Sequence, residues 1–102
     1  ELDNVIWDEI YSGMRSAIID GNGTGRKSDP NIEGLKIYGK TGTAENPHGN
    51  NHAWYSGWCE YKNEKFSVVI LLENAGSGGS VAAPIAKEIF AKISRDNFLV
   101  VK

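Results

Sequence analysis

The sequence predicts an α+β fold in which a three-stranded antiparallel meander is flanked by an N-terminal and a C-terminal helix. Three observations lead to this prediction. Apolar residues recur at helical spacing near both ends of the chain, three strand-like runs occupy its middle, and the connections between those runs suit antiparallel neighbours. A chain of 102 residues makes one domain at most, with one modest core.

The N-terminal helix is predicted from one apolar stripe on a 3.6-residue period. Asp3 or Asn4 can cap its start, and residues 20–25 (DGNGTG) end it, because glycines there can take left-handed conformations and close the last turn. These glycines follow a helix instead of a strand, so they do not indicate a dinucleotide-binding loop. The stripe consists of Trp7, Ile10, Tyr11, Met14, Ala17 and Ile18.

Three strand-like runs follow the first helix. Residues 35–44 alternate between apolar and polar, residues 52–61 are rich in aromatic side chains, and residues 66–73 (FSVVILLE) are continuously apolar, as in a strand covered on both faces. Residues 62–65 (KNEK) suit a hairpin, and residues 45–51 are a longer connection. Because FSVVILLE requires cover on both faces, we expect this chain to be part of a larger sheet.

The C-terminal helix is predicted after the glycine-rich turn at residues 74–80. Ser80 is the expected N-cap, and Pro84 falls near the first turn, where proline is best tolerated. One face of this helix carries Ala82, Ile85, Ala86, Ile89, Phe90 and Ile93.

Composition argues against several classes of function. The net charge is −2 and no basic run is present, so nothing indicates binding to nucleic acid or to an anionic membrane. No window approaches the roughly 20 apolar residues that span a bilayer. The chain starts at Glu1 without Met or a signal-like segment, so we expect an excised or processed piece. Cys59 has no second cysteine to pair with and is expected to be a small apolar filler.

Residues 34–42 (GLKIYGKTG) match two incompatible motifs. From Gly34 they match the phosphate-binding P-loop, G-x-x-x-x-G-K-[ST], and from Lys40 they read K-T-G, a signature of penicillin-binding proteins and serine β-lactamases. A P-loop leads from a strand through a flexible turn into a helix. Here the residues between the glycines alternate as in a strand, and Pro47 and Gly49 oppose a following helix. We therefore keep the K-T-G interpretation.

Further segments extend this interpretation into a family resemblance. YGKTGTAE, HAWYSGW and FSVVILLENAGSGGSVAAPIAKEIF resemble the C-terminal part of the transpeptidase domain of class B penicillin-binding proteins, closest to the elongation type called penicillin-binding protein 2. The similarity runs from about Tyr11 to Ile93. It implies a β-lactamase/transpeptidase-like fold in a membrane-anchored, periplasmic DD-transpeptidase that cross-links peptidoglycan through a serine acyl-enzyme.

The resemblance also implies roles for residues of the K-T-G strand. Lys40 sets the electrostatics of the site and, with Thr43, counts as catalytic. Thr41 and Thr43 present hydroxyls to the substrate's terminal carboxylate, and the backbone N–H of Thr43 completes the oxyanion hole. Gly42 lets the substrate backbone approach as an added strand. Trp54, on the next strand, is expected to line the cleft.

The family's nucleophile is missing from this chain. The family uses S-x-x-K for nucleophile and base and S-x-N for a second serine, and no serine here begins either pattern. We therefore expect residues 1–102 to be a C-terminal fragment of a transpeptidase domain that does not react with penicillin by itself. The serines are Ser12, Ser16, Ser28, Ser56, Ser67, Ser77, Ser80 and Ser94.

The resemblance implies D-alanyl-D-alanine stem peptides and β-lactams as ligands of the parent domain. The rest of that domain and a membrane glycosyltransferase would be its protein partners, and no cofactor or nucleic acid is expected. His48 and His52 have the spacing of helical metal ligands, but their segment reads as loop and strand, so no metal is expected. Two alternatives remain open, namely a β-lactamase or β-lactam sensor of the same fold, and a non-catalytic binding module.

Overall fold

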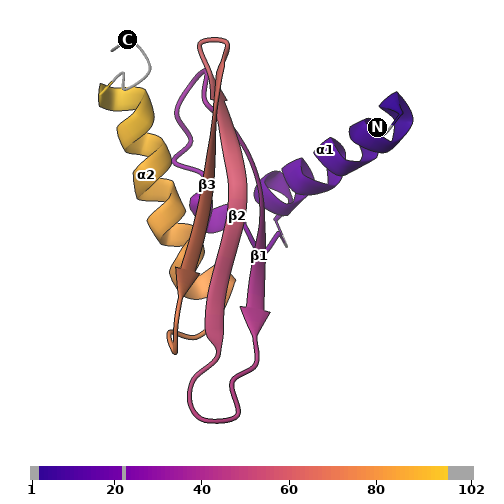
Figure 1. Cartoon of the computed structure of the whole chain (residues 1–102). Coiled ribbons are helices and arrows are strands. Elements are labelled where there is room, and N and C mark those ends of the chain that lie inside the picture. The colour runs from indigo at the N-terminus through magenta and orange to yellow at the C-terminus, as the bar shows by residue number, and fades with distance from the viewer. Residues whose placement is uncertain (1–2, 22, 97–102) are drawn as a thin grey trace.

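A computed structural model describes residues 3–21 and 23–96 of the chain. The elements are α1 (Asn4–Ile19), η1 (Arg26–Ser28), β1 (Lys36–Ala44), β2 (His52–Tyr61), β3 (Glu64–Leu72), η2 (Gly78–Ala82) and α2 (Ala83–Asp96). The strands form one antiparallel sheet in the order β1-β2-β3, and the helices flank it (Figure 1). The predicted α+β meander is therefore confirmed. No helix in this part of the chain is long and apolar enough to cross a membrane.

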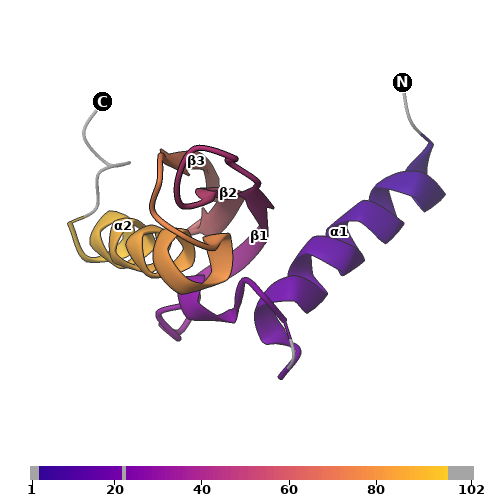
Figure 2. The same cartoon turned by 90° about the horizontal axis from the view of Figure 1, so that it is seen from below.

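Helix α1 begins where its capping residue predicts. The Asp3 carboxylate accepts hydrogen bonds from the backbone N–H groups of Val5 and Ile6, at 3.0 and 3.1 Å. The helix then projects away from the sheet, so that its C-terminal end lies closest to the other elements (Figure 2). Accordingly Ile18 is buried, whereas Trp7 at the outer end is 44% exposed. The predicted stripe is thus only partly used for packing in this chain.

Helix α1 ends at Ile19, next to the segment predicted to stop it, but the predicted left-handed conformation is absent at Gly21 and Gly25. Both glycines have φ outside the left-handed region. Instead, the Gly25 N–H donates to the carbonyl oxygen of Ala17 at 2.9 Å, and a Cβ atom at Gly23 would overlap that same carbonyl. These positions need a small residue because the chain folds back tightly against the helix end.

The β2–β3 hairpin is tighter than predicted. Tyr61 pairs with Glu64, so the turn consists of Lys62 and Asn63 alone, with φ of 50° and 65°. Positive φ at both central positions is typical of the two-residue turn whose twist matches that of the flanking strands.

The core lies between the sheet and α2. Ile37, Tyr55 and Phe90 are completely buried in it, and Cys59 fills the adjoining space as predicted. The described chain covers residues 66–73 on one face only, so the expected cover of the second face by a larger sheet stays a prediction. Ile70, which faces α2, is 9% exposed, but its neighbours Val69 and Leu71 are 68% and 46% exposed. We call this second side of the sheet, which α2 does not cover, the open face.

The predicted start of the last helix is corrected by one turn. Ser77 is the N-cap in place of Ser80, and its Oγ accepts the Ser80 backbone N–H at 3.2 Å. The short π-helical η2 then leads into α2, whose first turn includes Pro84 as predicted. Most of the predicted apolar face is buried (Ala82, Ala86, Phe90 and Ile93), while Ile85 and Ile89 stay 40% and 37% exposed.

Candidate functional site

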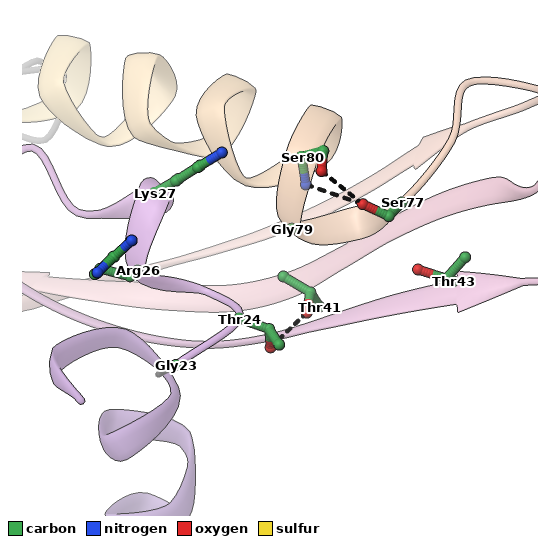
Figure 3. A pocket seen from close by; sticks show the side chains of 9 residues that line it. All are labelled: Gly23, Thr24, Arg26, Lys27, Thr41, Thr43, Ser77, Gly79 and Ser80. Atoms are coloured by element: carbon green, nitrogen blue, oxygen red, sulfur yellow. Dashed lines mark hydrogen bonds between the residues drawn. The ribbon is translucent and has the colours of Figure 1, made fainter. Parts of the chain in front are cut away.

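The side chains of the K-T-G strand are divided between the two faces of the sheet. Gly42 pairs directly with Trp54 across β1 and β2, and Lys40 lies two residues before Gly42, so these three share the open face. Thr41 and Thr43 alternate with them and face η2 instead, where they line a cavity (Figure 3). The structure thus brings Lys40, Gly42 and Trp54 together and separates them from the two threonine side chains.

The open face places Lys40 near exposed apolar groups. Lys40 is exposed, and its ammonium donates to the backbone carbonyl of Thr41 at 3.1 Å. Trp54 is 41% exposed, and Leu71 is its cross-strand partner on β3. A large ligand lying on this face would therefore meet Lys40 beside an apolar platform.

The outer edge of β1 carries backbone groups directed away from β2. Arg15 donates to the carbonyl oxygen of Ile37 at 2.7 Å, and Lys40 donates to that of Thr41. Since backbone groups of alternate residues point to the same side in an antiparallel strand, the N–H of Thr43 also points to this edge. Within the described sheet, no strand pairs there. An extended peptide can add to such an edge by main-chain hydrogen bonds.

A buried network holds the segment before β1 against the sheet. The Tyr55 hydroxyl donates to Ser28 Oγ at 2.9 Å, and Ser28 Oγ donates to the carbonyl oxygen of Gly25 at 2.7 Å. Burial raises the pKa of Tyr55 to about 12, so the phenol is neutral at physiological pH. Its ring crosses β1 at Gly39, where a Cβ atom would overlap the hydroxyl. This network fixes the position of η1.

Two further contacts join the K-T-G threonines to their neighbours. Thr41 Oγ1 donates to Thr24 Oγ1 at 2.7 Å (Figure 3), and Thr43 Oγ1 accepts the backbone N–H of Gly78 at 3.2 Å. A side chain at Gly78 would overlap the carbonyl oxygens of Gly42 and its partner on β2. The start of η2 therefore packs directly on the strand backbone.

These contacts surround an open cavity of about 350 Å³ between residues 23–27, β1 and the start of η2. Its walls are polar, and two of its residues, Arg26 and Lys27, are cations that the sequence analysis did not single out. No spacing signal connects them to the K-T-G motif, because the folding of the α1–β1 connection alone brings them to the cavity. The lining residues are Gly23, Thr24, Arg26, Lys27, Thr41, Thr43, Ser77, Gly79 and Ser80.

The other candidate residues have ordinary structural surroundings. His52 Nδ1 accepts the backbone N–H of Asn74 at 3.0 Å, and residues 3–21 and 23–96 contain no group of three or more potential metal ligands. Burial raises the pKa of Cys59, which keeps it in the unreactive thiol form. The P-loop hypothesis is contradicted, because β1 continues through Lys40 to Ala44 and the next element is the strand β2, not a helix.

Comparisons with known proteins point to one family. A family model for the penicillin binding protein transpeptidase domain matches residues 2–91. Peptidoglycan D,D-transpeptidase MrdA of Haemophilus influenzae is 37% identical over 98 residues, which cover 81% of this chain and 15% of that protein. The chain thus spans less than a fifth of this relative.

Solved structures give the same result. Pseudomonas aeruginosa PBP2, in complex with WCK 5153, matches with a TM-score of 0.70 and 31% identity, covering 88% of this chain and 19% of that one. Penicillin-binding protein A of M. tuberculosis, solved as a ceftriaxone acyl-enzyme complex, matches with a TM-score of 0.52 and 33% identity. That match covers 66% of this chain and 17% of the solved one.

Proposed function

This chain belongs to the penicillin-binding protein transpeptidase family, and on that premise we propose that it is the C-terminal part of a peptidoglycan DD-transpeptidase domain. In this proposal β1 is the strand that binds the stem peptide, and a serine elsewhere in the domain is the nucleophile. The reaction is extracytoplasmic cross-linking of peptides that end in D-alanyl-D-alanine, in a protein anchored in the membrane and working with a glycosyltransferase.

The observation that carries this proposal is the outward direction of the Thr43 N–H at the unpaired edge of β1. When a serine Oγ bonds to the peptide carbonyl carbon, negative charge develops on the carbonyl oxygen. The bond to the terminal D-alanine nitrogen then breaks, and the serine proton passes to that leaving amine. A fixed backbone N–H stabilises the developing charge and needs no reorganisation during the reaction. The acyl group is finally transferred to the amine of a second stem peptide.

The surroundings of Thr43 also suit recognition of a carboxylate. Its Oγ1 already accepts a hydrogen bond from Gly78, so its own proton is available to donate to a ligand. Thr41 is only 9% exposed and donates to Thr24. We therefore assign carboxylate binding chiefly to Thr43, and assign to Thr41 the role of holding residues 23–27 beside the strand. Lys40 acts on the open face, where its positive charge favours anionic groups of the reaction.

Acylation by β-lactams follows from the same assignment. The M. tuberculosis relative was solved as an acyl-enzyme with ceftriaxone, and it aligns with this chain at 33% identity. Since no serine of this chain begins S-x-x-K, we assign the acylated serine to the rest of the domain.

The experiment that tests the proposal is covalent labelling of the protein with its natural upstream sequence. After incubation with benzylpenicillin, intact mass spectrometry should show one adduct. Thr43→Pro removes the N–H at an edge position where proline is tolerated, and should slow acylation by about 10²- to 10³-fold. Thr43→Val keeps the N–H and should slow acylation less than Thr43→Pro does. A folded protein that forms no adduct would favour the binding-module alternative, and rapid hydrolysis of the adduct would favour a β-lactamase.

The contribution of Lys40 can be tested on the same strand. Lys40→Ala removes a charge that we place at the site, and it should slow acylation by about 10- to 100-fold, as expected for a hydrogen bond to a charged group. Lys36→Ala removes an equal charge from the same face of β1, and acylation should stay within about twofold of wild type. Equal effects of the two substitutions would remove Lys40 from the site.

A further inference from the structure

Asn74 connects two turns at the end of the sheet where the K-T-G strand finishes (Figure 1). Its backbone N–H donates to His52 Nδ1 at 3.0 Å, and its side-chain oxygen accepts a hydrogen bond from the side-chain amide of Asn46. Its carbonyl oxygen accepts a further hydrogen bond from the side chain of Asn50 at 3.5 Å. Three polar groups of one residue in the β3–η2 turn therefore bind the β1–β2 loop (residues 45–51) and the first residue of β2.

The conformation of the β3–η2 turn depends on these contacts. Asn74 has a φ of 56°, in the left-handed region that few residues besides glycine and asparagine adopt readily. Such a conformation persists where the surrounding structure fixes it. Two residues later, the Gly76 N–H donates to the carbonyl oxygen of Asn51 at 2.9 Å, so the turn has a second attachment to the same loop.

The β3–η2 turn leads directly to a contact with the K-T-G strand. Ser77 caps η2, and the backbone N–H of Gly78 donates to Thr43 Oγ1 at 3.2 Å. Gly78 is buried and leaves no room for a Cβ atom against the backbone of Gly42. Because only three residues separate Asn74 from Gly78, a shift of Asn74 would also move the start of η2 relative to β1.

The hydrogen bond from Asn74 to His52 depends on the protonation of the imidazole. Nδ1 accepts the Asn74 N–H only while it carries no proton, because both nitrogens of a protonated imidazole are donors. Imidazole is the side chain that ordinarily changes charge between about pH 5 and 8. The titratable groups in the segments around His52 are Glu45 and His48 in the β1–β2 loop, Glu73 just after β3, and Lys40 on β1.

We propose that Asn74 is a positioning residue for the K-T-G strand, and that neutral His52 holds it in place, so that acidification loosens the contact between η2 and β1. This inference rests on the proposed function and deepens it, because it adds a pH-sensitive support to the same site. His52 acts through Asn74 and Gly78, and not by contact with a substrate. Acidification should therefore slow acylation more than the titration of the reacting groups alone does.

The test compares acylation by benzylpenicillin at about pH 7.5 and about pH 5, on the protein with its natural flanking sequence. His52→Asn puts a side-chain oxygen near the position of Nδ1, where it can accept the same hydrogen bond without titrating. The ratio of the wild-type rate to the His52→Asn rate cancels the titration of other groups. This ratio should fall by about 2- to 10-fold on acidification, the range expected for one hydrogen bond.

Two further variants control this comparison. His48→Asn removes the exposed histidine of the same loop, and its acylation rate should follow the wild-type pH profile. Asn74→Gly keeps the N–H and permits the positive φ, but it loses the side-chain oxygen that binds Asn46, so acylation should be slower than in wild type at both pH values. A His48→Asn profile that matched His52→Asn would overturn the assignment to His52.

Hydrogen exchange separates this inference from the proposed function. On acidification, the protection factors of the Asn74 and Gly78 amides, measured by rapid mixing, should fall together in wild type and stay constant in His52→Asn. An unchanged rate ratio, or equal protection in the two proteins, would overturn the positioning role and leave the transpeptidase assignment in place. If the folded wild type forms no adduct, the proposed function fails, and a joint loss of protection would still support the role of His52. No adduct and no loss of protection would overturn both.

Discussion

The two faces of the three-stranded sheet contribute differently to the candidate site. Under α2, Ile37 and Tyr55 are completely buried, whereas on the open face Trp54 and Val69 are 41% and 68% exposed. Side chains of the K-T-G strand lie on both faces. The packed face holds the backbone of β1 and the α1–β1 connection in place, and the open face leaves Lys40 accessible to a ligand. Precise placement of a site and access to it are therefore provided by opposite sides of the same strand.

The largest expected difference between the faces lies in the core under α2. Phe90→Ala should lower the free energy of unfolding by about 3–5 kcal/mol, because it deletes a fully buried aromatic ring and leaves a cavity. Ile89→Ala, one position away and 37% exposed, should cost less than about 1.5 kcal/mol. Urea denaturation of the 102-residue chain in a stabilising osmolyte measures both losses. Equal losses would contradict the packing described for α2.

Alkaline pH offers a way to test the packed face through Tyr55. Tyr55 has an ordinary pKa of 10.0 that the fold raises to about 12, so its contribution to stability is fully present below pH 10. Between pH 10 and 12 the unfolded chain loses this proton and the folded chain keeps it, so stability should fall by about 1.4 kcal/mol per pH unit. The stability of the Tyr55→Phe variant should depend less on pH over this range. Identical pH profiles for the two proteins would show that Tyr55 is not held neutral by the fold.

A smaller effect is expected where the packed face meets the cavity. Thr24→Val and Thr41→Val each break the hydrogen bond between the two hydroxyls, at a cost of about 1 kcal/mol. A double-mutant cycle on thermal stability should therefore give a coupling energy of about 0.5–1.5 kcal/mol. Additive losses would mean that the α1–β1 connection is not tied to the K-T-G strand through this pair.

The smallest effect is expected on the open face. Val69→Ala should change the stability of the 102-residue chain by less than about 0.5 kcal/mol, because that side chain is 68% exposed. In the protein with its natural flanking sequence the loss should exceed about 1 kcal/mol, since we expect other parts of the domain to cover this face. A small loss in both proteins would contradict the proposal that the chain is part of a larger sheet.

Much of the local structure was predictable because it depends on neighbouring residues. Helical spacing identified α1 and α2, and alternation identified β1 and led to the rejection of the P-loop. The cap, Asp3, is one of the two residues predicted from side-chain chemistry. The prediction of Ser80 as the N-cap failed because the cap, Ser77, lies in the same glycine-rich segment, and sequence does not show which turn begins the helix. The left-handed closure of α1 was mistaken because Gly23 and Gly25 are needed for their small size.

The sequence by itself determined the elements, their antiparallel order, the K-T-G motif and the family it resembles, since these follow from local spacing and residue type. Only the tertiary structure decided which residues share a face or a cavity. It placed Arg26 and Lys27 beside the cavity that Thr41 and Thr43 line, and it left one face of β3 exposed. The physical reason is that these arrangements depend on contacts between distant segments. The hydrogen bond from Tyr55 to Ser28, for example, joins residues 27 positions apart, and no local pattern encodes it.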